Sequence, residues 1–501
     1  MRIEVEAGIN GCVLITDSYE SELKCLTQHS LAFLEQQTDR SMPRTLILSD
    51  SDAKDFYDIC QDVNRAISDN LLQEVIFIGD KILAYKDILS FSSKEFYKNL
   101  DDFLLSDFFY RIENRAILVK ISSKYNSSLL LNRLRLLVHD TILEIDFNAL
   151  YKNVTYFRLK LEADTKLMCM VKASAYGSGS VEVSRALQYW HCDYLAVAFV
   201  DEGVELRREG IKMPILVLDP SVDALERIVE YNLEPEIYSF RLLDSMLNLL
   251  QRLGKKDYPI HLKFDTGMHR AGFEENDIED LASLLKNSSE VKVVSVYSHL
   301  VGSDDEFFDE FTEHQISYFD FCAEKIKMRL GYPVLKHILN SSGIERFSSF
   351  QFDMVRLGIG LWGISCLDGN LSNVCSLKTK ISQIRKVKSG DTIGYSRKGV
   401  VTRDSKIALL PLGYADGIDR RLGNGNLSVW IKGTPYPTIG NICMDLMMVD
   451  LTDAPNIEEG EEVVVFGSKQ SLSDIAEKLA TIPYEVLTSI SPRVRRVYFD
   501  E

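Results

Sequence analysis

The chain has 501 residues, of which 46% are hydrophobic and 26% are charged. These ordinary globular values exclude a long disordered, collagenous or low-complexity region, and the length predicts two or three domains. Because 57 Lys and Arg stand against 74 Asp and Glu, the net charge of −17 argues against nucleic acid or an anionic membrane surface as a partner.

Cysteine usage and the amino terminus indicate a cytoplasmic protein. The nine cysteines include no Cys-x-x-Cys pair and no His/Cys cluster at zinc spacing, which predicts reduced thiols and no metal site. The first residues, MRIEVEAGINGCVLITD, lack the order of a signal peptide, and no run of apolar residues is long enough for a membrane span.

Residues 1–139 alternate short β-branched runs with helical stretches. The runs begin at Cys12, Thr45, Glu74 and Ala116. A helix is predicted over residues 21–37, where Leu23, Leu26, Leu31 and Leu34 form one apolar face. This alternation predicts a small α/β domain with a parallel sheet, similar in class to Rossmann-like domains.

A second βα rhythm runs through residues 140–374. After a strand near Leu143, eight strand candidates begin near Lys166, Tyr194, Pro214, Glu234, Ile260, Lys292, Val334 and Met354. Eight parallel strands fit a (β/α)8 (TIM) barrel, and a doubly wound sheet is the alternative. Polar residues at the ends of apolar runs favour the barrel, namely Lys172, Asp265, His299, Asn340 and Arg356. Residues 375–501 change to short strands with turns and one late helix over residues 472–479, which predicts a mostly β domain.

Lys172 follows a predicted strand and precedes a glycine-containing turn. In the low-dielectric mouth of a barrel its ammonium form would be disfavoured, which suits a lysine that reacts as an amine. Taken alone, Lys172 could equally be a surface residue, because most lysines are exposed.

The segment VKASAYGSG at residues 171–179 resembles the cofactor-lysine motif of alanine racemases, V-K-A-N-A-Y-G-H-G. Further segments match that family in order across residues 140–501: KFDTGMHRAGF, YSHLVGSDD, HILNSSG, MVRLGIGLWG, GYADG, GNICMD and IPYEVLTSISPRV. The resemblance implies a barrel followed by a β domain, pyridoxal 5'-phosphate as cofactor, and an isomerase that interconverts L-alanine and D-alanine for cell-wall peptidoglycan.

The resemblance also implies the catalytic residues. Lys172 would hold the cofactor and act as the base for the D-amino acid, and Tyr414 of GYADG, paired with His299, would act as the base for the L-amino acid. Without this context Tyr414 would be read as a packed turn tyrosine. Arg356 would face the pyridine nitrogen, with His337 as its neighbour. Because a guanidinium with a pKa above about 12 does not release its proton, the ring nitrogen should stay unprotonated, which favours racemisation over transamination.

The remaining implied contacts concern the phosphate, the substrate and a second subunit. The cofactor set is completed by Tyr176, Asn340, Ser341, Gly358, Ile359 and Tyr484. Arg270 and the backbone of Met444 match substrate-carboxylate positions, and Lys263 matches a lysine that is carbamylated in many relatives. A head-to-tail homodimer is implied, in which Tyr414 and Met444 complete the partner's site.

The first 139 residues resemble the carboxyl-terminal domain of the Mur ligase that adds D-alanyl-D-alanine to the cell-wall precursor, in GCVLITDSYESELKCLTQHSLAFLEQQ and RTLILSD. Some bacteria fuse that ligase to alanine racemase. The family's D-S-Y-N-x-N-P appears here as DSYESEL, and K-G-A-R as VKISSK. No G-x-x-G-K-S/T loop for ATP is present. We therefore expect a structural or docking domain, in a natural remnant or in the carboxyl-terminal part of a fusion whose missing domains would be needed for ligation.

Three other functions remain open from the sequence. A racemase of broader amino-acid range would share all these motifs, because pocket size sets specificity. A decarboxylase of the same fold type fits GYADG and NICMD less well, and a non-catalytic cofactor carrier would be a barrel alone.

Overall fold

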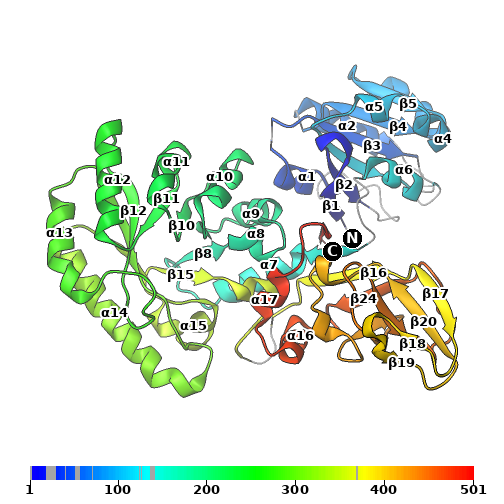
Figure 1. Cartoon of the computed structure of the whole chain (residues 1–501). Helices are drawn as coiled ribbons and strands as arrows, with labels where there is room; N and C mark the ends of the chain where they lie inside the picture. Colours follow the sequence, from blue (N-terminus) through cyan, green and yellow to red (C-terminus); the bar gives the residue numbers. More distant parts are fainter. Residues whose placement is uncertain are drawn as a thin grey trace. The chain divides into compact units, whose positions relative to one another are not determined.

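The computed structural model describes residues 3–17, 30–39, 41–50, 57–69, 71–122, 125, 127–135, 141–367 and 371–500. The chain divides into two compact units. We call Ala149–Val374 with Ile482–Thr488 the barrel unit, and Met1–Asn148 with Cys375–Thr481 and Ser489–Glu501 the sheet unit. Figure 1 labels the elements of both units. Within the described ranges, no helix has the length and apolar character needed to cross a membrane.

Eight parallel strands form the barrel, in the order β14-β13-β12-β11-β10-β9-β8-β15. They are β8 (Lys166–Met170), β9 (Tyr194–Val197), β10 (Ile215–Val217), β11 (Glu234–Ile237), β12 (Tyr258–Lys263), β13 (Val291–Tyr297), β14 (Leu335–His337) and β15 (Met354–Leu357). The end strands meet through backbone hydrogen bonds from Asp353 to Lys336 (3.1 Å) and from Arg356 to Leu339 (3.0 Å). The predicted barrel is therefore confirmed, and the doubly wound alternative is wrong.

Helices separate the barrel strands along the chain. They are α7 (Phe147–Arg158), α8 (Lys172–Tyr176), α9 (Ser180–Tyr189), α10 (Val200–Arg208), α11 (Leu225–Glu230), α12 (Phe240–Leu253), α13 (Ile278–Lys286), α14 (Asp309–Leu330) and α15 (Ser341–Arg346). In α12, the Ser239 side chain caps the first turn by accepting from the Leu242 amide, and Gly254 ends the helix at φ 64°. Its buried face consists of Leu242, Leu243, Met246, Leu249 and Leu250, at helical spacing.

The amino-terminal part of the sheet unit has the predicted parallel sheet. Its strands are β2 (Val13–Asp17), β6 (Ala116–Lys120), β3 (Arg44–Ser49), β4 (Glu74–Ile78) and β5 (Lys94–Tyr97), paired in that order. The helices of this part are α1 (Leu31–Gln37), α2 (Tyr57–Ser68), α3 (Asp80–Leu83), α4 (Leu100–Leu104), α5 (Phe108–Arg111) and α6 (Ser127–Leu134). Strand β5 escaped prediction because it is short and charged at its start. Of the helix predicted over residues 21–37, the part before residue 30 lies outside the described residues.

The remaining strands of the sheet unit are mostly antiparallel, and their number confirms the mostly β character predicted for residues 375–501. They are β16 (Cys375–Lys380), β17 (Gln383–Val387), β18 (Thr392–Ile393), β19 (Gly399–Val400), β20 (Ser405–Leu410), β21 (Ser428–Ile431), β22 (Thr434–Pro437), β23 (Met447–Asp450), β24 (Glu462–Phe466) and β25 (Arg495–Asp500). The strand predicted near Leu143 is β7 (Ile142–Asp146), which pairs with β16 and β25.

Two helices occur late in the chain, where the sequence predicted one. Helix α16 (Leu472–Leu479) lies at its predicted place in the sheet unit. The prediction missed α17 (Pro483–Thr488), which belongs to the barrel unit. A six-residue helix is too short to show a clear apolar period.

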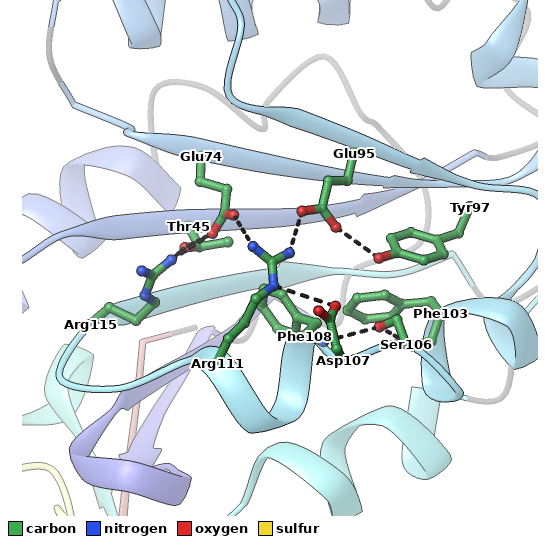
Figure 2. A network of polar contacts seen from close by, with 10 residues as sticks. All are labelled: Thr45, Glu74, Glu95, Tyr97, Phe103, Ser106, Asp107, Phe108, Arg111 and Arg115. Carbon is green, nitrogen blue, oxygen red and sulfur yellow. Dashed lines mark hydrogen bonds and ion pairs between the residues drawn. The ribbon is translucent and has the colours of Figure 1, made fainter.

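A polar network ties the amino-terminal ends of the parallel strands together (Figure 2). Glu74 at the start of β4 accepts hydrogen bonds from Thr45 of β3 (3.0 Å), Arg115 before β6 (2.5 Å) and Arg111 (3.4 Å). Arg111 also pairs with Glu95 of β5. Ligands of α/β sheets bind at the opposite, carboxyl edge, so this network is structural.

Strand β1 (Ile3–Ala7) joins the parallel sheet to the antiparallel strands of the sheet unit. It runs antiparallel to both β2 and β25, so one twelve-stranded sheet extends from β22 to β5. The fully buried carboxylate of Glu6 on β1 pairs with Arg135 and with Arg495 of β25. Glu6 therefore links the amino-terminal part of the sheet unit to strand β25.

Replacing Glu6 with Gln should destabilise the sheet unit by about 2 kcal/mol, because two arginines lose their shared buried partner. The expected result is a lower melting temperature and faster proteolytic release of the amino-terminal domain. Glu462→Gln is the control, since Glu462 is an exposed acid on β24 of the same sheet. Equal stability of both variants would contradict the assigned role of Glu6.

Candidate active site

A cavity of about 600 Å³ opens at the carboxyl ends of the barrel strands. Most of the predicted site residues line it: Lys172, Tyr176, Lys263, Arg270, His299, Asn340, Ser341, Arg356, Gly358, Ile359 and Tyr484. All of these belong to the barrel unit. His337 lies behind the wall, bonded to Arg356, whereas Tyr414 and Met444 belong to the sheet unit.

Lys172 begins a left-handed turn directly after β8. The next four residues, Ala173, Ser174, Ala175 and Tyr176, all have φ between 50° and 57°. For residues other than glycine this conformation costs roughly 1 kcal/mol or more each, so surrounding contacts must impose it. Glu202 supplies such a contact, because its carboxylate accepts from the backbone amides of Ala173, Ala198 and Phe199. Strain of this kind is typical of functional sites.

The electrostatics of the cavity favour the neutral amine of Lys172. Burial lowers the pKa of Lys172, and the positive charges of Arg270 and Lys263 lower it further, although Glu202 raises it. A lysine with a lowered pKa reacts more readily as a nucleophile and as a base.

Arg356 on β15 points into the barrel and is fully engaged. Its guanidinium donates to His337 Nδ1 (2.7 Å), the Ser298 carbonyl (2.6 Å), the Ile338 carbonyl (3.0 Å) and His299 Nδ1 (3.2 Å). Burial lowers the pKa of Arg356 to about 10, below the ordinary value of a guanidinium. The group still stays protonated at neutral pH.

The contacts of Arg356 fix the protonation of both histidines. An arginine can only donate, so Nδ1 of His299 and Nδ1 of His337 must accept, and any ring proton sits on Nε2. Burial and the charge of Arg356 hold the pKa of each histidine well below its ordinary value. Both rings are therefore neutral, and each presents an Nε2–H donor.

The Nε2–H group of His337 begins a series of buried hydrogen bonds. His337 Nε2 donates to Ser295 Oγ (2.9 Å), which reaches His261 Nδ1 at 2.6 Å. His261 Nε2 in turn lies 2.7 Å from Glu234. This chain anchors the Arg356–His337 pair across three barrel strands.

Small residues and hydroxyls form a cradle where β14 and β15 end. Ser341 Oγ, at the start of α15, accepts from the amides of Gly358 (3.0 Å) and Gly360 (3.2 Å). A Cβ on Gly358 would lie 2.7 Å from the Tyr176 hydroxyl, so only a glycine lets this hydroxyl come so close to the backbone. Helix α17 brings the Tyr484 ring to 6.0 Å from that of Tyr176. Amides and hydroxyls in this arrangement suit a phosphate group.

Arg270 sits in the loop after β12. Asp265 fixes this loop by accepting from the amides of Gly267 (3.0 Å), Met268 (3.1 Å) and His269 (3.0 Å). Among the described residues Arg270 forms no hydrogen bond or ion pair, although it lines the cavity. Its guanidinium is therefore available for a carboxylate.

Tyr414 and Met444 lie together in the sheet unit. Tyr414 donates its amide to the Cys443 carbonyl (3.0 Å), and the Ala415 amide bonds the Met444 carbonyl (2.9 Å). The side chains of Tyr414 and Met444 are 43% and 54% exposed. The GYADG and NICMD segments are thus joined by backbone hydrogen bonds, and the side chains of Tyr414 and Met444 are both exposed on them.

The sequence analysis missed Glu236 and Tyr297 in the cavity wall. Glu236 of β11 is 1% exposed and pairs with Lys263 of β12 at 3.1 Å, and the Tyr297 hydroxyl of β13 donates to it. The second glutamate of the short predicted strand EPEI was the available signal, because a carboxylate buried in a barrel strand needs a partner.

These residues fit pyridoxal phosphate. The cavity offers an amine of lowered pKa at Lys172, a permanent donor at Arg356 and a phosphate cradle around Gly358. Fold and site together define a barrel enzyme built for a phosphorylated carbonyl cofactor.

Comparison with known proteins gives the family. Residues 145–366 match the family model "Alanine racemase, N-terminal domain", and residues 374–498 match "Alanine racemase, C-terminal domain". Alanine racemase 2 of Caldanaerobacter subterraneus subsp. tengcongensis is 36% identical over 381 residues, covering 72% of this chain and 95% of that protein. Alanine racemase of Thermodesulfovibrio yellowstonii is 37% identical over 365 residues, covering 72% and 97%.

Solved structures agree. Alanine racemase of Clostridium difficile 630 has a TM-score of 0.69 at 34% identity, covering 72% of this chain and 96% of that one. Alanine racemase from Bartonella henselae with covalently bound pyridoxal phosphate has a TM-score of 0.66 at 28% identity, covering 72% and 99%. The chain belongs to the alanine racemase family.

The cradle can be tested by filling it. Gly358→Ala should lower the affinity for pyridoxal phosphate at least tenfold, because the new methyl meets the Tyr176 hydroxyl. In a Tyr176→Phe background the nearest remaining contact is 3.5 Å away, at Met170, so the same change should cost much less. The measurement is cofactor titration by absorbance in the four proteins of the cycle. Equal losses in both backgrounds would show that the cradle is not at Gly358.

Proposed function

We propose that this chain is a pyridoxal-phosphate-dependent isomerase that interconverts L-alanine and D-alanine, supplying D-alanine for peptidoglycan. The observation that carries the proposal is the joint placement of Lys172, Arg356 and the Gly358 cradle in one cavity of a family member. When bound, pyridoxal phosphate would withdraw electron density from the substrate Cα and so acidify its hydrogen.

Lys172 anchors the cofactor and handles the Cα proton of the D-enantiomer. Its lowered pKa supports both roles, because the neutral amine is nucleophilic and can accept a proton. Arg270 binds the substrate carboxylate, for which its unpaired guanidinium and its place on the cavity wall are the support.

Tyr414 serves as the second base, for the L-enantiomer. Inversion needs a base on each face of a planar carbon, and Lys172 supplies only one face. A tyrosine needs a nearby donor to act as a phenolate, and the neutral His299, with its proton on Nε2, is suited to that task. Because Tyr414 and Met444 are exposed together in the sheet unit, we assign them to the cavity of a second subunit in a homodimer.

Arg356 tunes the reaction toward racemisation. Its guanidinium stays charged at neutral pH and can only donate, so Arg356 would hold the ring nitrogen of pyridoxal phosphate by a hydrogen bond without giving up its proton. A ring that gains no proton would withdraw less electron density, which would favour return of the proton to the substrate Cα.

Two variants test the bases. Lys172→Ala should lose the protein-bound cofactor absorbance, and Tyr414→Phe should keep it; both should lose racemisation by about 1000-fold. The measurement is conversion of L-alanine to D-alanine alongside cofactor spectra. An active Lys172→Ala enzyme would refute the mechanism.

Mixing the two inactive variants tests the shared site. If Tyr414 completes the partner's cavity, random exchange of subunits yields heterodimers with one intact site, and about a quarter of wild-type activity returns. If both bases came from one subunit, every site would carry a lesion and the mixture would stay inactive.

For the organisation of the chain, we infer domains at residues 1–139, 140–374 and 375–501, the first being related to the carboxyl-terminal domain of the Mur ligase. Its parallel sheet with interspersed helices supports this relation. The role of this amino-terminal domain is structural or in docking, and the pairing of β1 with β25 supports the structural role.

A reducing, cytoplasmic location is consistent with the eight free cysteines of the described residues.

Removing residues 1–139 should leave racemisation per folded site unchanged and lower solubility, because strand β25 would expose an unpaired edge. Size-exclusion chromatography and activity per bound cofactor measure the two effects. Unchanged solubility, activity and binding partners would remove any role for the domain.

A further inference from the structure

A buried acid sits among the cations of the active-site cavity. The wall carries Lys172, Lys263, Arg270 and Arg356, and in the described lining residues only Asp219 and Glu236 are acidic. Glu236 is 1% exposed. Burial raises the pKa of Glu236, whereas the charge of Lys263 and the hydrogen bonds from Tyr297 and Lys263 lower it. A carboxylate this deep therefore depends on these contacts to stay an anion.

Both oxygens of Glu236 have a partner. Oε1 accepts from Lys263 Nζ at 3.1 Å, and Oε2 accepts from the Tyr297 hydroxyl. The three residues end or nearly end the neighbouring strands β11, β12 and β13, and Lys263 is in register with Tyr297. The pairing is therefore set by the strand register of the barrel.

Tyr297 lies between the Glu236–Lys263 pair and the residues Arg356 and His337. Its ring stacks on His337, with centroids 4.7 Å apart and planes 9° apart. The Lys263 ammonium lies 5.8 Å from the ring centroid and the Arg356 guanidinium 5.1 Å. Glu236 thus binds Lys263 directly and is separated from Arg356 by the Tyr297 ring.

We propose that Glu236 is a positioning residue that supplies the fixed anion of this wall and holds Lys263 as an unmodified ammonium, so that Lys263 is not carbamylated in this chain. Carbamylation joins the neutral lysine nitrogen to the carbon of CO2 and releases one proton. A lysine nitrogen held as an ammonium by Glu236 has no free lone pair for that bond. The product would also place a second anion beside a buried carboxylate.

The charge of Lys263 matters for its neighbours. As a cation, Lys263 lowers the pKa of Lys172, whereas a carbamate at the same place would raise it. Glu236 also opposes the effect of burial on the pKa of Arg356, which keeps the guanidinium charged. The Glu236–Lys263 pair therefore contributes an anion for Arg356 and a cation for Lys172 with no net charge.

The modification is tested on the holoenzyme without reference to activity. Wild-type protein in ¹³C-labelled bicarbonate should show no lysine carbamate resonance at neutral pH in ¹³C NMR. Exposed amines, which form carbamates at raised pH, show that the signal is detectable. A neutral-pH resonance in the wild type that disappears in Lys263→Arg would overturn the proposal.

The positioning role is tested by kinetics, and this part rests on the proposed racemase activity. Glu236→Gln should raise KM for alanine about tenfold and change kcat less, because Lys263 is left unpaired beside Arg270. Glu236→Gln with Lys263→Met removes both charges and should recover most of the loss. Glu324→Gln is the matched control, since it removes an acid from the Lys336 pair on the outside of the same barrel.

An unchanged KM in Glu236→Gln, or a double variant worse than either single one, would overturn the positioning role. Cofactor absorbance and melting temperature identify variants that fail to fold, and the NMR result on the wild type then still decides the state of Lys263. If the wild type binds pyridoxal phosphate but does not racemise alanine, the proposed function fails while the carbamate result remains valid.

Discussion

The active site depends on one buried guanidinium. Arg356 sits in β15, where burying a charge without partners would be prohibitive, and residues at the ends of the neighbouring strands supply three backbone carbonyls and two imidazoles as acceptors. Because all these partners must accept, both histidines are forced to be neutral with their protons on Nε2. One charged residue therefore sets the tautomers, the polar chain to Glu234 and the donor that His299 presents to the cavity.

Of the other basic residues of the cavity, Lys263 has an acidic partner. The chain carries a net charge of −17, yet four basic residues line the cavity, where the phosphate and the substrate carboxylate would bind. Among the described residues Arg270 has no hydrogen bond or ion pair, whereas Lys263 is paired with Glu236 at 3.1 Å. The difference between a binding cation and a structural one thus lies in whether a neighbouring strand provides an acid.

The amino-terminal part of the sheet unit is joined to the rest of that unit by backbone pairing between strands. Strand β1 covers the edge of β25, and the Glu6 carboxylate pairs with both Arg135 and Arg495. An edge strand left open is prone to intermolecular pairing, so this junction gives the domain a physical role whatever else it binds.

The sequence by itself determined the eight barrel strands, the parallel amino-terminal sheet and the catalytic motifs, because hydrophobic period and local motifs are encoded by neighbouring residues. It also placed Arg356 at the end of an apolar run, with His337 as its neighbour. The sequence did not reveal that β7 joins β25, that α17 carries Tyr484 into the barrel unit, or that Glu236 meets Lys263. These contacts join residues from 27 to more than 300 positions apart, as in Tyr176 with Tyr484, and only the tertiary structure decided them. Strand register and burial, which no local pattern specifies, select which charges become partners.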